Sequence, residues 1–246
     1  MPANELIEVS AALLRLLPTG VASSVGLIAD HYPSLAPAEL ATTARMSAGR
    51  RQEFSAGRAH ARIALQSLRV GMGVGLDSPV VPMGADRAPL WPQGFVGSIS
   101  HAGELVLAVA APWTLLSALG VDLEPALLLD GDLLNRVCRP EEVTRLADSP
   151  EPLREAKLIF SAKESVYKCV APVLGIFLDF PDLEILFDRE EEQFHARGHG
   201  PAAALIGPDT VTGRFADAGG YWLTAAWQGQ GFLARRSRPE RRSIPE

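Results

Sequence analysis

Residues 160–168 read FSAKESVYK and lie in a helical pattern that we expect to run from about Pro152 to Val170. Apolar residues mark the core side of this helix: Ala156, Ile159, Phe160, Val166, Tyr167 and Val170. Polar residues follow at steps of four, three and four, which places them on one face: Lys157, Ser161, Glu164 and Lys168. The spacing therefore predicts a long helix with a buried side and a polar stripe. An ordinary alternative for Glu164 and Lys168 is a solvated i,i+4 pair, worth only about 0.3–0.5 kcal/mol.

A short acidic motif, GVDLEP, precedes this helix at residues 120–125. We expect a strand over Leu119–Glu124 that ends at Pro125. Side chains alternate along a strand, so Asp122 and Glu124 point to the same side and Leu123 to the opposite one. Burying unpaired carboxylates is costly, so the pair indicates either a functional site or a solvent-exposed strand end.

A third motif, GSISH, occupies residues 97–101. The three motifs together supply the carboxylates of Asp122, Glu124 and Glu164 and the ammonium groups of Lys163 and Lys168. Oxygen ligands suit Mg²⁺, and Lys, Arg and His side chains suit phosphate oxygens. The combination suggests a metal ion held next to phosphates. For Ser100 and His101, the alternative is a turn with a structural histidine.

The rest of the chain predicts a mixed α/β protein. We expect helices over 5–17, from the N-cap Ser47 onward and from about 140, and a loop over 72–93 with a short strand near Val80. We expect strands over 105–110 and 182–187, and a hairpin that joins 221–228 to 232–235. Arg51, Arg58 and Arg62 project from one side of the second helix, as a binding face or simply a solvated one.

Bulk properties exclude several classes of protein. The 246 residues are 47% hydrophobic and 21% charged, which favours a packed core over disorder. The net charge of −6 argues against a nonspecific nucleic-acid binder, and no apolar run approaches the roughly 20 residues of a membrane span. Cys138 and Cys169 lack metal-ligand spacing and are interpreted as reduced thiols. With no basic region at the start of the chain, we expect a cytoplasmic protein.

The order of the motifs resembles that of the 4′-phosphopantetheinyl transferases. WPxGxxGSISH, GVDLEP and FSAKESVYK follow one another as in the surfactin-synthase-activating and enterobactin synthase component D type, and RRQEFxxGRxxARxAL upstream is also similar. The resemblance covers roughly residues 45–235. It implies two similar α/β halves in one chain, a pseudo-dimer divided into 1–116 and 117–246, with coenzyme A in the cleft between them.

The same resemblance implies an activity, which is transfer of the phosphopantetheine arm of coenzyme A to a serine of an apo carrier protein. Adenosine 3′,5′-bisphosphate is the other product. Asp122, Glu124 and Glu164 match the ligands of Mg²⁺, with Mn²⁺ as an alternative. Either Glu164 or a metal-held water takes the serine proton, and Lys168 neutralises the pyrophosphate. The catalytic residues implied are Asp122, His101, Glu164 and Lys168.

The resemblance also implies which residues bind coenzyme A. Ser100 and His101 match a phosphate-contacting motif, and Arg51 and Arg58 match residues that hold the adenosine phosphates. The remaining candidates are Arg87, at a position where relatives have a basic residue or a gap, Lys168, and Lys163, which is either structural or a phosphate ligand.

The sequence departs from the family pattern in two places. Ala102 stands where many relatives have cysteine, which the expected chemistry does not need, and residues 171–180 lack the aromatic-rich form of some relatives, which concerns the choice of carrier and not the reaction. An apolar surface near 173–177 is either the docking site for an acyl, peptidyl or aryl carrier protein or ordinary core. We expect a monomer that serves siderophore (enterobactin-type), nonribosomal peptide or other secondary metabolism. The alternatives are a catalytically silent relative and a Mg²⁺-dependent phosphohydrolase.

Overall fold

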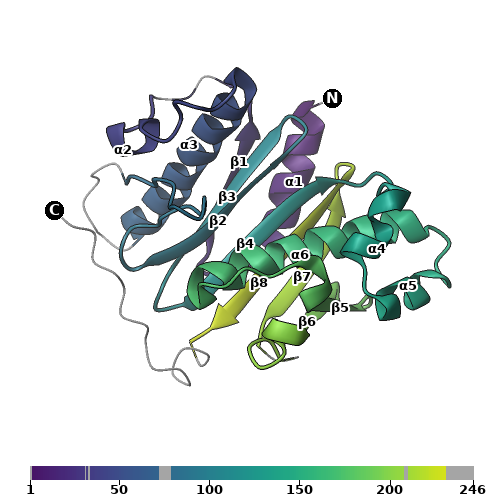
Figure 1. Cartoon of the computed structure of the whole chain (residues 1–246). Coiled ribbons are helices and arrows are strands. Elements are labelled where there is room, and N and C mark those ends of the chain that lie inside the picture. The colour runs from purple at the N-terminus through teal and green to yellow at the C-terminus, as the bar shows by residue number, and fades with distance from the viewer. Residues whose placement is uncertain (1, 31, 33, 72–78, 208–209, 231–246) are drawn as a thin grey trace.

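The computed structural model describes residues 2–30, 32, 34–71, 79–207 and 210–230, which form two antiparallel sheets (Figure 1). The first sheet has the order β1-β3-β2, from strands β1 (Ala22–Leu27), β2 (Phe95–Ala102) and β3 (Leu105–Pro112). The second has the order β4-β8-β7-β6-β5. Its strands are β4 (Leu116–Pro125), β5 (Leu183–Asp188), β6 (Gln193–Gly198), β7 (Thr212–Ala218) and β8 (Tyr221–Gly229). The mixed α/β fold class is confirmed.

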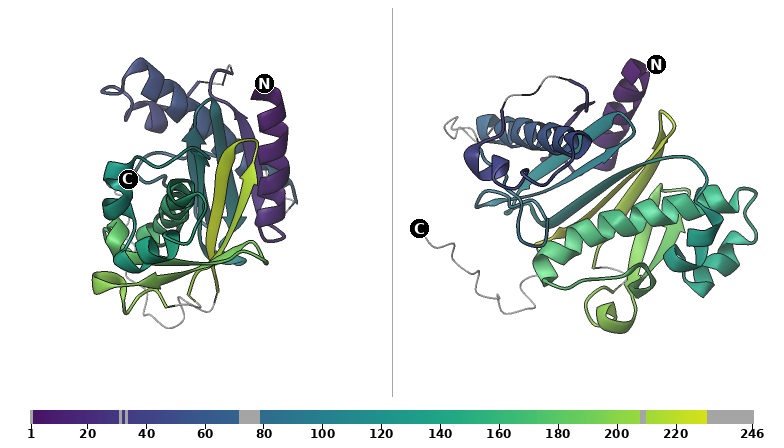
Figure 2. Two further views of the ribbon diagram at one scale, coloured as in Figure 1. Left: turned by 90° about the vertical axis from the view of Figure 1, so that its right-hand side faces the viewer. Right: turned by 45° about the horizontal axis from the view of Figure 1, so that its top comes forward.

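One long helix covers each sheet, as Figure 2 shows. Helix α3 (Ala48–Gly71) packs on β1 and β3, and helix α6 (Pro152–Leu174) packs on β4 and β8. Helix α1 (Pro2–Leu16) contacts β1 of the first sheet and β7 and β8 of the second. The shorter helices are α2 (Pro37–Leu40), α4 (Leu134–Val137) and α5 (Pro140–Leu146), with 3₁₀ turns at Gly131–Leu133, Phe180–Asp182 and Gly200–Ala202.

The core has three parts, one on each helix-covered face and one between the sheets and α1. α6 buries Ala156, Leu158 and Val166 against the second sheet, while α3 buries Ala61 and Leu65 against the first. A third cluster joins α1 to both sheets through residues such as Leu13, Leu107 and Leu223. Burial of these side chains, at about 25 cal/mol per Å², is the main force that holds the layers together.

Two serines of β2 connect the first sheet to the second. The backbone N–H of Val121 donates to Ser98 Oγ at 3.1 Å, and that of Leu123 donates to Ser100 Oγ at 3.3 Å. Both serines are buried, and both acceptors are side-chain atoms. The two sheets therefore meet at β2 and β4 through hydroxyl groups, directly beside the acidic motif.

Gly120 sets how closely α6 approaches β4. A Cβ atom at this position would lie 2.5 Å from the backbone nitrogen of Cys169 and would overlap the carbonyl oxygen of Ser165. Real side chains do not tolerate such contacts with backbone atoms. The glycine that precedes Asp122 by two residues thus lets the helix lie directly on the strand.

The sequence predictions were right for α1, α3, α5, α6, β3, β4 and β5, within a few residues at their ends. Ser47 caps α3, because the N–H of Arg50 donates to its Oγ at 3.3 Å. β1, β2, β6 and β7 were not predicted. Near Val80 the structure has no strand among the described residues of that loop, only a bridge between Met83 and Pro89.

The first arm of the predicted hairpin is confirmed as strand β8. β8 pairs with β7, through a turn at Gly219 and Gly220 whose φ angles are 59° and 80°. Positive φ costs glycine little, so these two residues permit the tight connection. The expected second arm, 232–235, lies outside the described residues.

Candidate active site

Asp122 lies at the centre of a buried polar cluster where β2, β4 and α6 meet. Its Oδ1 accepts from Ser100 Oγ at 3.0 Å and from Lys168 Nζ at 2.6 Å. Its Oδ2 accepts from Ser161 Oγ at 2.9 Å. The carboxylate is almost fully buried, so these charge-assisted bonds offset its loss of hydration. Lys168 therefore pairs with the strand rather than with Glu164 as an i,i+4 surface neighbour.

The polar stripe of α6 faces β4 along its whole length. Lys157 Nζ lies 2.6 Å from Glu124 Oε2, Ser161 and Lys168 bind Asp122, and Glu164 lies between them on the helix. Asp122 and Glu124 both meet this stripe, as strand alternation predicts, while Leu123 is buried in the apolar cluster on the other side.

Glu164 lies in surroundings that favour proton uptake by its carboxylate. Burial raises the pKa of its carboxyl group above the usual range, and the Asp122 and Glu124 carboxylates raise it further, while Lys168 lowers it. Burial likewise raises the pKa of Glu124 despite its bond to Lys157. Three carboxylates thus share one electrostatic neighbourhood, which a cation would stabilise.

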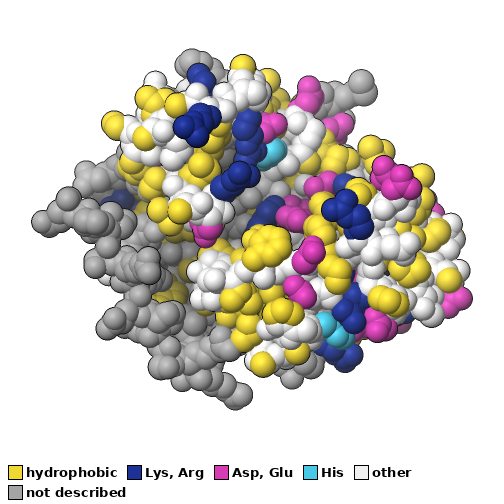
Figure 3. All heavy atoms as spheres, viewed as in Figure 1, with side chains coloured by type: hydrophobic (Ala, Val, Ile, Leu, Met, Phe, Trp, Pro, Cys, Tyr) yellow, Lys and Arg dark blue, Asp and Glu magenta, His cyan; other side chains and the backbone are white. Residues whose placement is uncertain are grey.

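On the side of this cluster that faces α3, Arg50 lies next to His101 and Glu53. Arg50 Nη1 lies 2.7 Å from His101 Nε2 and 3.0 Å from Glu53 Oε2. Burial lowers the pKa of His101, and the nearby Arg50 and Lys168 charges lower it too, although Glu53 opposes them. Figure 3 shows Lys and Arg side chains beside a histidine over α3, with carboxylates across a hollow from them. Neutral His101 can accept a hydrogen bond from Arg50, and together they face the Asp122 cluster.

Arg50 was missed by the sequence analysis, which chose its neighbour Arg51. Arg51 is exposed, donates to the carbonyl oxygen of Met46 at 3.4 Å and lines a second hollow of about 340 Å³ with Asp30 and Tyr32. Adjacent helical residues point about 100° apart, so only the placement of α3 on β2 could distinguish the two arginines.

Arg58 and Arg62 of α3 are buried, so they do not form the solvated face that was one of the two alternatives. Arg62 is buried and lies 2.5 Å from Glu39, so its role is structural. Arg58 is buried over the Phe54 ring, and burial lowers the pKa of its guanidinium to about 10. Its Nε has no hydrogen-bond partner among the residues that the structure describes. Arg62 Nη2 likewise lacks a partner there, but Arg62 is paired with Glu39, whereas Arg58 forms no salt bridge with the described residues and is therefore better suited to an anionic ligand. Arg87 is exposed in a loop and has φ 68°.

The structure corrects the expectation that Lys163 binds coenzyme A, because its buried side chain cannot reach a ligand at the Asp122 cluster. Its side chain is 0% exposed and pairs with Glu142 at 2.6 Å. The ammonium also donates to the carbonyl oxygens of Val137 and Phe180 at 2.8 and 3.1 Å. All three of its protons are used inside the protein, so Lys163 ties α6 to the segments around α4 and α5 and is not a residue that binds coenzyme A.

The carboxylates fit a hard divalent cation by their chemistry, since they are oxygen donors, and burial together with their mutual repulsion raises the pKa values of Glu124 and Glu164. They do not form a preassembled cage. Within the described ranges, no three His, Cys, Asp or Glu side chains are close enough to hold a metal ion together. Instead, Lys168 and Lys157 form ion pairs with Asp122 and Glu124, respectively.

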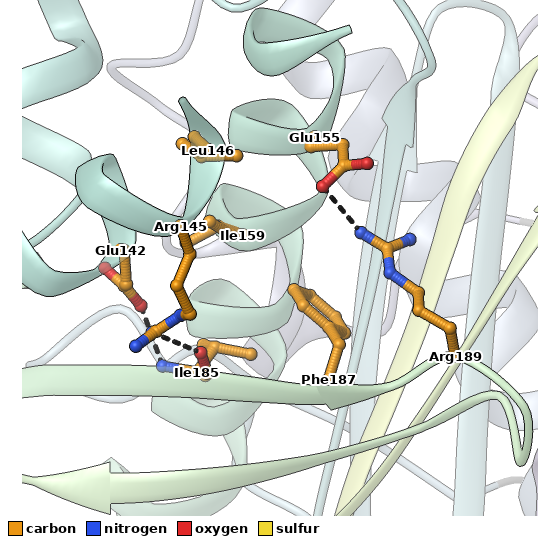
Figure 4. Close-up of a pocket in the computed structure, with 8 residues that line it drawn as sticks. All are labelled: Glu142, Arg145, Leu146, Glu155, Ile159, Ile185, Phe187 and Arg189. Carbon is orange, nitrogen blue, oxygen red and sulfur yellow. Dashed lines mark hydrogen bonds and ion pairs between the residues drawn. The ribbon is translucent and has the colours of Figure 1, made fainter. Parts of the chain in front are cut away.

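A separate pocket of about 160 Å³ lies between α5, α6 and β5 (Figure 4). Its two arginines already have partners, since Arg145 binds Glu184 and Arg189 binds Glu155. Glu142 at its edge neutralises Lys163. None of the candidate site residues lines this pocket, so we assign it no role in the chemistry.

The site residues lie in two segments that match known families. The 4′-phosphopantetheinyl transferase N-terminal domain matches residues 37–111, and the 4′-phosphopantetheinyl transferase superfamily matches residues 118–216. The transferase Svp of Streptomyces mobaraensis is 36% identical over 201 residues, which cover 80% of this chain and 79% of that protein. The chain belongs to the 4′-phosphopantetheinyl transferase family. The family resemblance and the enzyme class expected from the motifs are therefore confirmed.

Two further relatives and one solved structure are also similar to this transferase. Npt of Nocardia iowensis is 30% identical over 220 residues, covering 85% of this chain and 96% of the relative. Enterobactin synthase component D of Escherichia coli K12 is 34% identical over 125 residues, covering 47% and 58%. Among solved structures, the holo-[acyl-carrier-protein] synthase of Thermotoga maritima matches with a TM-score of 0.37 and 14% identity, covering 52% of this chain and 79% of that one.

Proposed function

We propose that this transferase moves the 4′-phosphopantetheine arm of coenzyme A to a serine of an apo carrier protein in a Mg²⁺-dependent reaction. The supporting observation is the Asp122 cluster, where the motifs of both halves meet at α6, with Arg50 bound to the adjacent His101. A serine oxygen forms a bond to the phosphorus that carries pantetheine. The bond from that phosphorus to the adenosine 3′,5′-bisphosphate oxygen breaks, and the leaving phosphate takes up the negative charge.

The serine proton needs an acceptor within the cluster. Glu164 is suited to this role because burial raises its pKa toward neutrality, where a general base is most effective. A water molecule held by the metal is the alternative. Asp122, Glu124 and Glu164 would hold the divalent ion, which would neutralise the pyrophosphate and make the phosphorus easier to attack. Mn²⁺ is an alternative ion, because the same oxygen ligands accept it.

The cations of both halves would orient coenzyme A. Lys168 donates to Ser100 and Asp122, where we expect the pyrophosphate to bind, and His101 follows Ser100 on β2. Arg50, Arg51 and Arg58 would bind the phosphates of the adenosine end. The unused Nε of Arg58 supports this assignment. Arg87, in its exposed loop, stays a prediction for the same end of the ligand.

The partner and setting are also proposals. The relatives include an enterobactin synthase component, which favours carriers of siderophore or nonribosomal peptide assembly. Phe177 is 77% exposed while Val173, Leu174 and Ile176 are partly buried, so we retain this surface for carrier docking. We further propose a cytoplasmic monomer whose halves, 1–116 and 117–246, meet where β4 begins.

No helix in the described part of the chain is both long enough and apolar enough to cross a membrane.

Intact-protein mass spectrometry tests the proposed reaction. One apo peptidyl and one apo acyl carrier protein are incubated with enzyme, coenzyme A and Mg²⁺, with and without EDTA. A mass gain of one phosphopantetheine arm that is lost with EDTA is the expected result, with adenosine 3′,5′-bisphosphate released in equal amount. No gain on either carrier by an enzyme that still binds coenzyme A would favour a catalytically silent relative. A bisphosphate release that needs no carrier would favour a hydrolase.

A further inference from the structure

Lys157 has no role in the reaction as proposed, yet it contacts one of the three carboxylates directly. Its Nζ lies 2.6 Å from Glu124 Oε2, and the two side chains are 18% and 23% exposed. The same ammonium lies 4.8 Å from the centre of the Phe160 ring. The pair is sheltered, and it attaches the end of strand β4 to helix α6 at the edge of the Asp122 cluster.

A second lysine of α6 makes the equivalent contact further along the helix. Lys168 lies 2.6 Å from Asp122, so two of the three carboxylates each carry an ammonium group. Glu164 is on the same stripe between these lysines, and its carboxylate makes no side-chain hydrogen bond with the residues that the structure describes. Three negative charges therefore face two positive ones supplied by the protein itself.

A divalent cation cannot simply be added to this arrangement. Two ammonium groups and a divalent ion would put four positive charges against three negative ones, and the lysines occupy the oxygens that the metal needs. A divalent ion would therefore compete with the ammonium groups for Glu124 Oε2 and Asp122 Oδ1. Lys168 also donates to Ser100 Oγ at 3.1 Å, whereas Lys157 has Glu124 and the adjacent Phe160 face as its contacts. An aromatic face can keep stabilising an ammonium group after it has left a carboxylate.

We propose that Lys157 is a positioning residue that acts as a tethered counter-ion of Glu124. In the metal-free enzyme it neutralises Glu124 and holds it toward α6, and it releases the carboxylate to the divalent ion. The inference rests on the metal site of the proposed function. It has a consequence that a merely structural lysine would not have, because Lys157 and the metal compete for the same oxygen and removing the ammonium must tighten metal binding.

Binding of Mn²⁺ to the full chain, followed by electron paramagnetic resonance of the free ion, tests this directly. Lys157→Met should bind Mn²⁺ about three- to five-fold more tightly than wild type, as expected for loss of a competing, partly screened ion pair. Mn²⁺ should also raise the melting temperature of this variant more than that of wild type. Lys157→Arg, which keeps the charge, should bind Mn²⁺ much as wild type does.

Arg189→Met is the control for net charge, because it removes one positive charge from a more exposed ion pair, with Glu155, in the same half of the chain. It should leave Mn²⁺ affinity unchanged. Equal tightening in this control would assign the effect to net charge and overturn the proposal, as would unchanged or weaker Mn²⁺ binding by Lys157→Met. Wild-type enzyme that binds no Mn²⁺ at millimolar concentration would instead overturn the metal site itself, so the two failures are distinguishable.

Discussion

Replacing Lys163 by methionine should destabilise the enzyme strongly without altering its affinity for coenzyme A. The ammonium and the Glu142 carboxylate are both 0% exposed and 2.6 Å apart. At an effective dielectric constant of about 20, their attraction is about 6 kcal/mol before desolvation is subtracted. Removing one partner of a buried pair, with the other left uncompensated, costs about 3–5 kcal/mol. For a chain of this size the melting temperature should fall by about 6–20 °C.

Urea unfolding at pH 7.5 measures this loss, and a double-mutant cycle assigns it to the pair. Glu142 also accepts from the backbone N–H groups of Arg139 and Ile185, at 2.7 Å each, so Glu142→Gln preserves part of its bonding. The double variant Lys163→Met/Glu142→Gln should be less unstable than the sum of the single variants by about 1–3 kcal/mol.

The result that would refute this reasoning is a Lys163→Met variant within 1 kcal/mol of wild type. It would mean that the buried contact contributes little. A variant of wild-type stability with a strongly raised KM for coenzyme A would restore Lys163 as a binding residue. The expected variant, assayed well below its melting temperature, keeps the KM of wild type.

Four further outcomes follow from the site and its surroundings. Asp122→Asn should lower kcat by at least about a hundredfold while the protein stays folded, and near-normal turnover in the carrier assay would contradict its central place. Arg50→Ala should raise the KM for coenzyme A about tenfold with a smaller effect on kcat, and an unchanged KM in initial-rate kinetics would remove it from the binding site. Gly120→Ala should lower stability by more than about 3 kcal/mol in urea unfolding because its Cβ meets the backbone of α6, and a milder loss would show that the helix can shift. Burial lowers the pKa of His60, so the unfolded chain binds the proton more readily and the free energy of unfolding should fall as pH drops below about 6.5. His60→Gln should lessen that fall between pH 7.5 and 5.5. An identical dependence of the unfolding free energy on pH in wild type and variant would exclude His60 as its source.

The acidic cluster could be predicted from the sequence because its geometry follows from two simple periodicities. Alternation along β4 places Asp122 and Glu124 on one side, and helical spacing places the stripe of α6 on one face. Both patterns involve charged residues inside otherwise apolar elements, which is the clearest signal that a single sequence offers. What periodicity could not give is the pairing of Lys157 with Glu124, because that depends on the offset between strand and helix.

Strand β2 was missed because its residues are selected by packing rather than by β propensity. Gly97 is required where the Trp91 ring and the carbonyl oxygen of Val109 approach, since a Cβ there would lie 2.6 Å from the ring. Ser98 and Ser100 are present because their hydroxyls bind β4. A segment of glycine and serine is typical of a turn when its neighbours in space are unknown.

The sequence could not decide whether Lys163 is structural or a phosphate ligand, for a related reason. Its neighbours in the sequence are catalytic candidates, but its side chain points to the opposite side of α6, where α4, α5 and the Phe180–Asp182 turn cover it. The enclosure is made by connecting segments whose placement no local pattern predicts. Burial of a lysine is rare, so nothing in the sequence favoured the structural alternative.

The hydroxyl of Ser100 bridges the two sheets and also binds Asp122, so the relative position of the sheets should affect the rate of the reaction. It accepts from Leu123 N–H and Lys168, and donates to Asp122, so its one donor and two acceptor positions are all used. A small rotation of one sheet against the other would therefore reorient the carboxylate before any backbone ladder breaks. Substitutions in α1, which contacts both sheets, should for that reason slow the enzyme at temperatures where it remains fully folded. In this transferase, catalytic rate should be a more sensitive measure of how the halves are aligned than unfolding is.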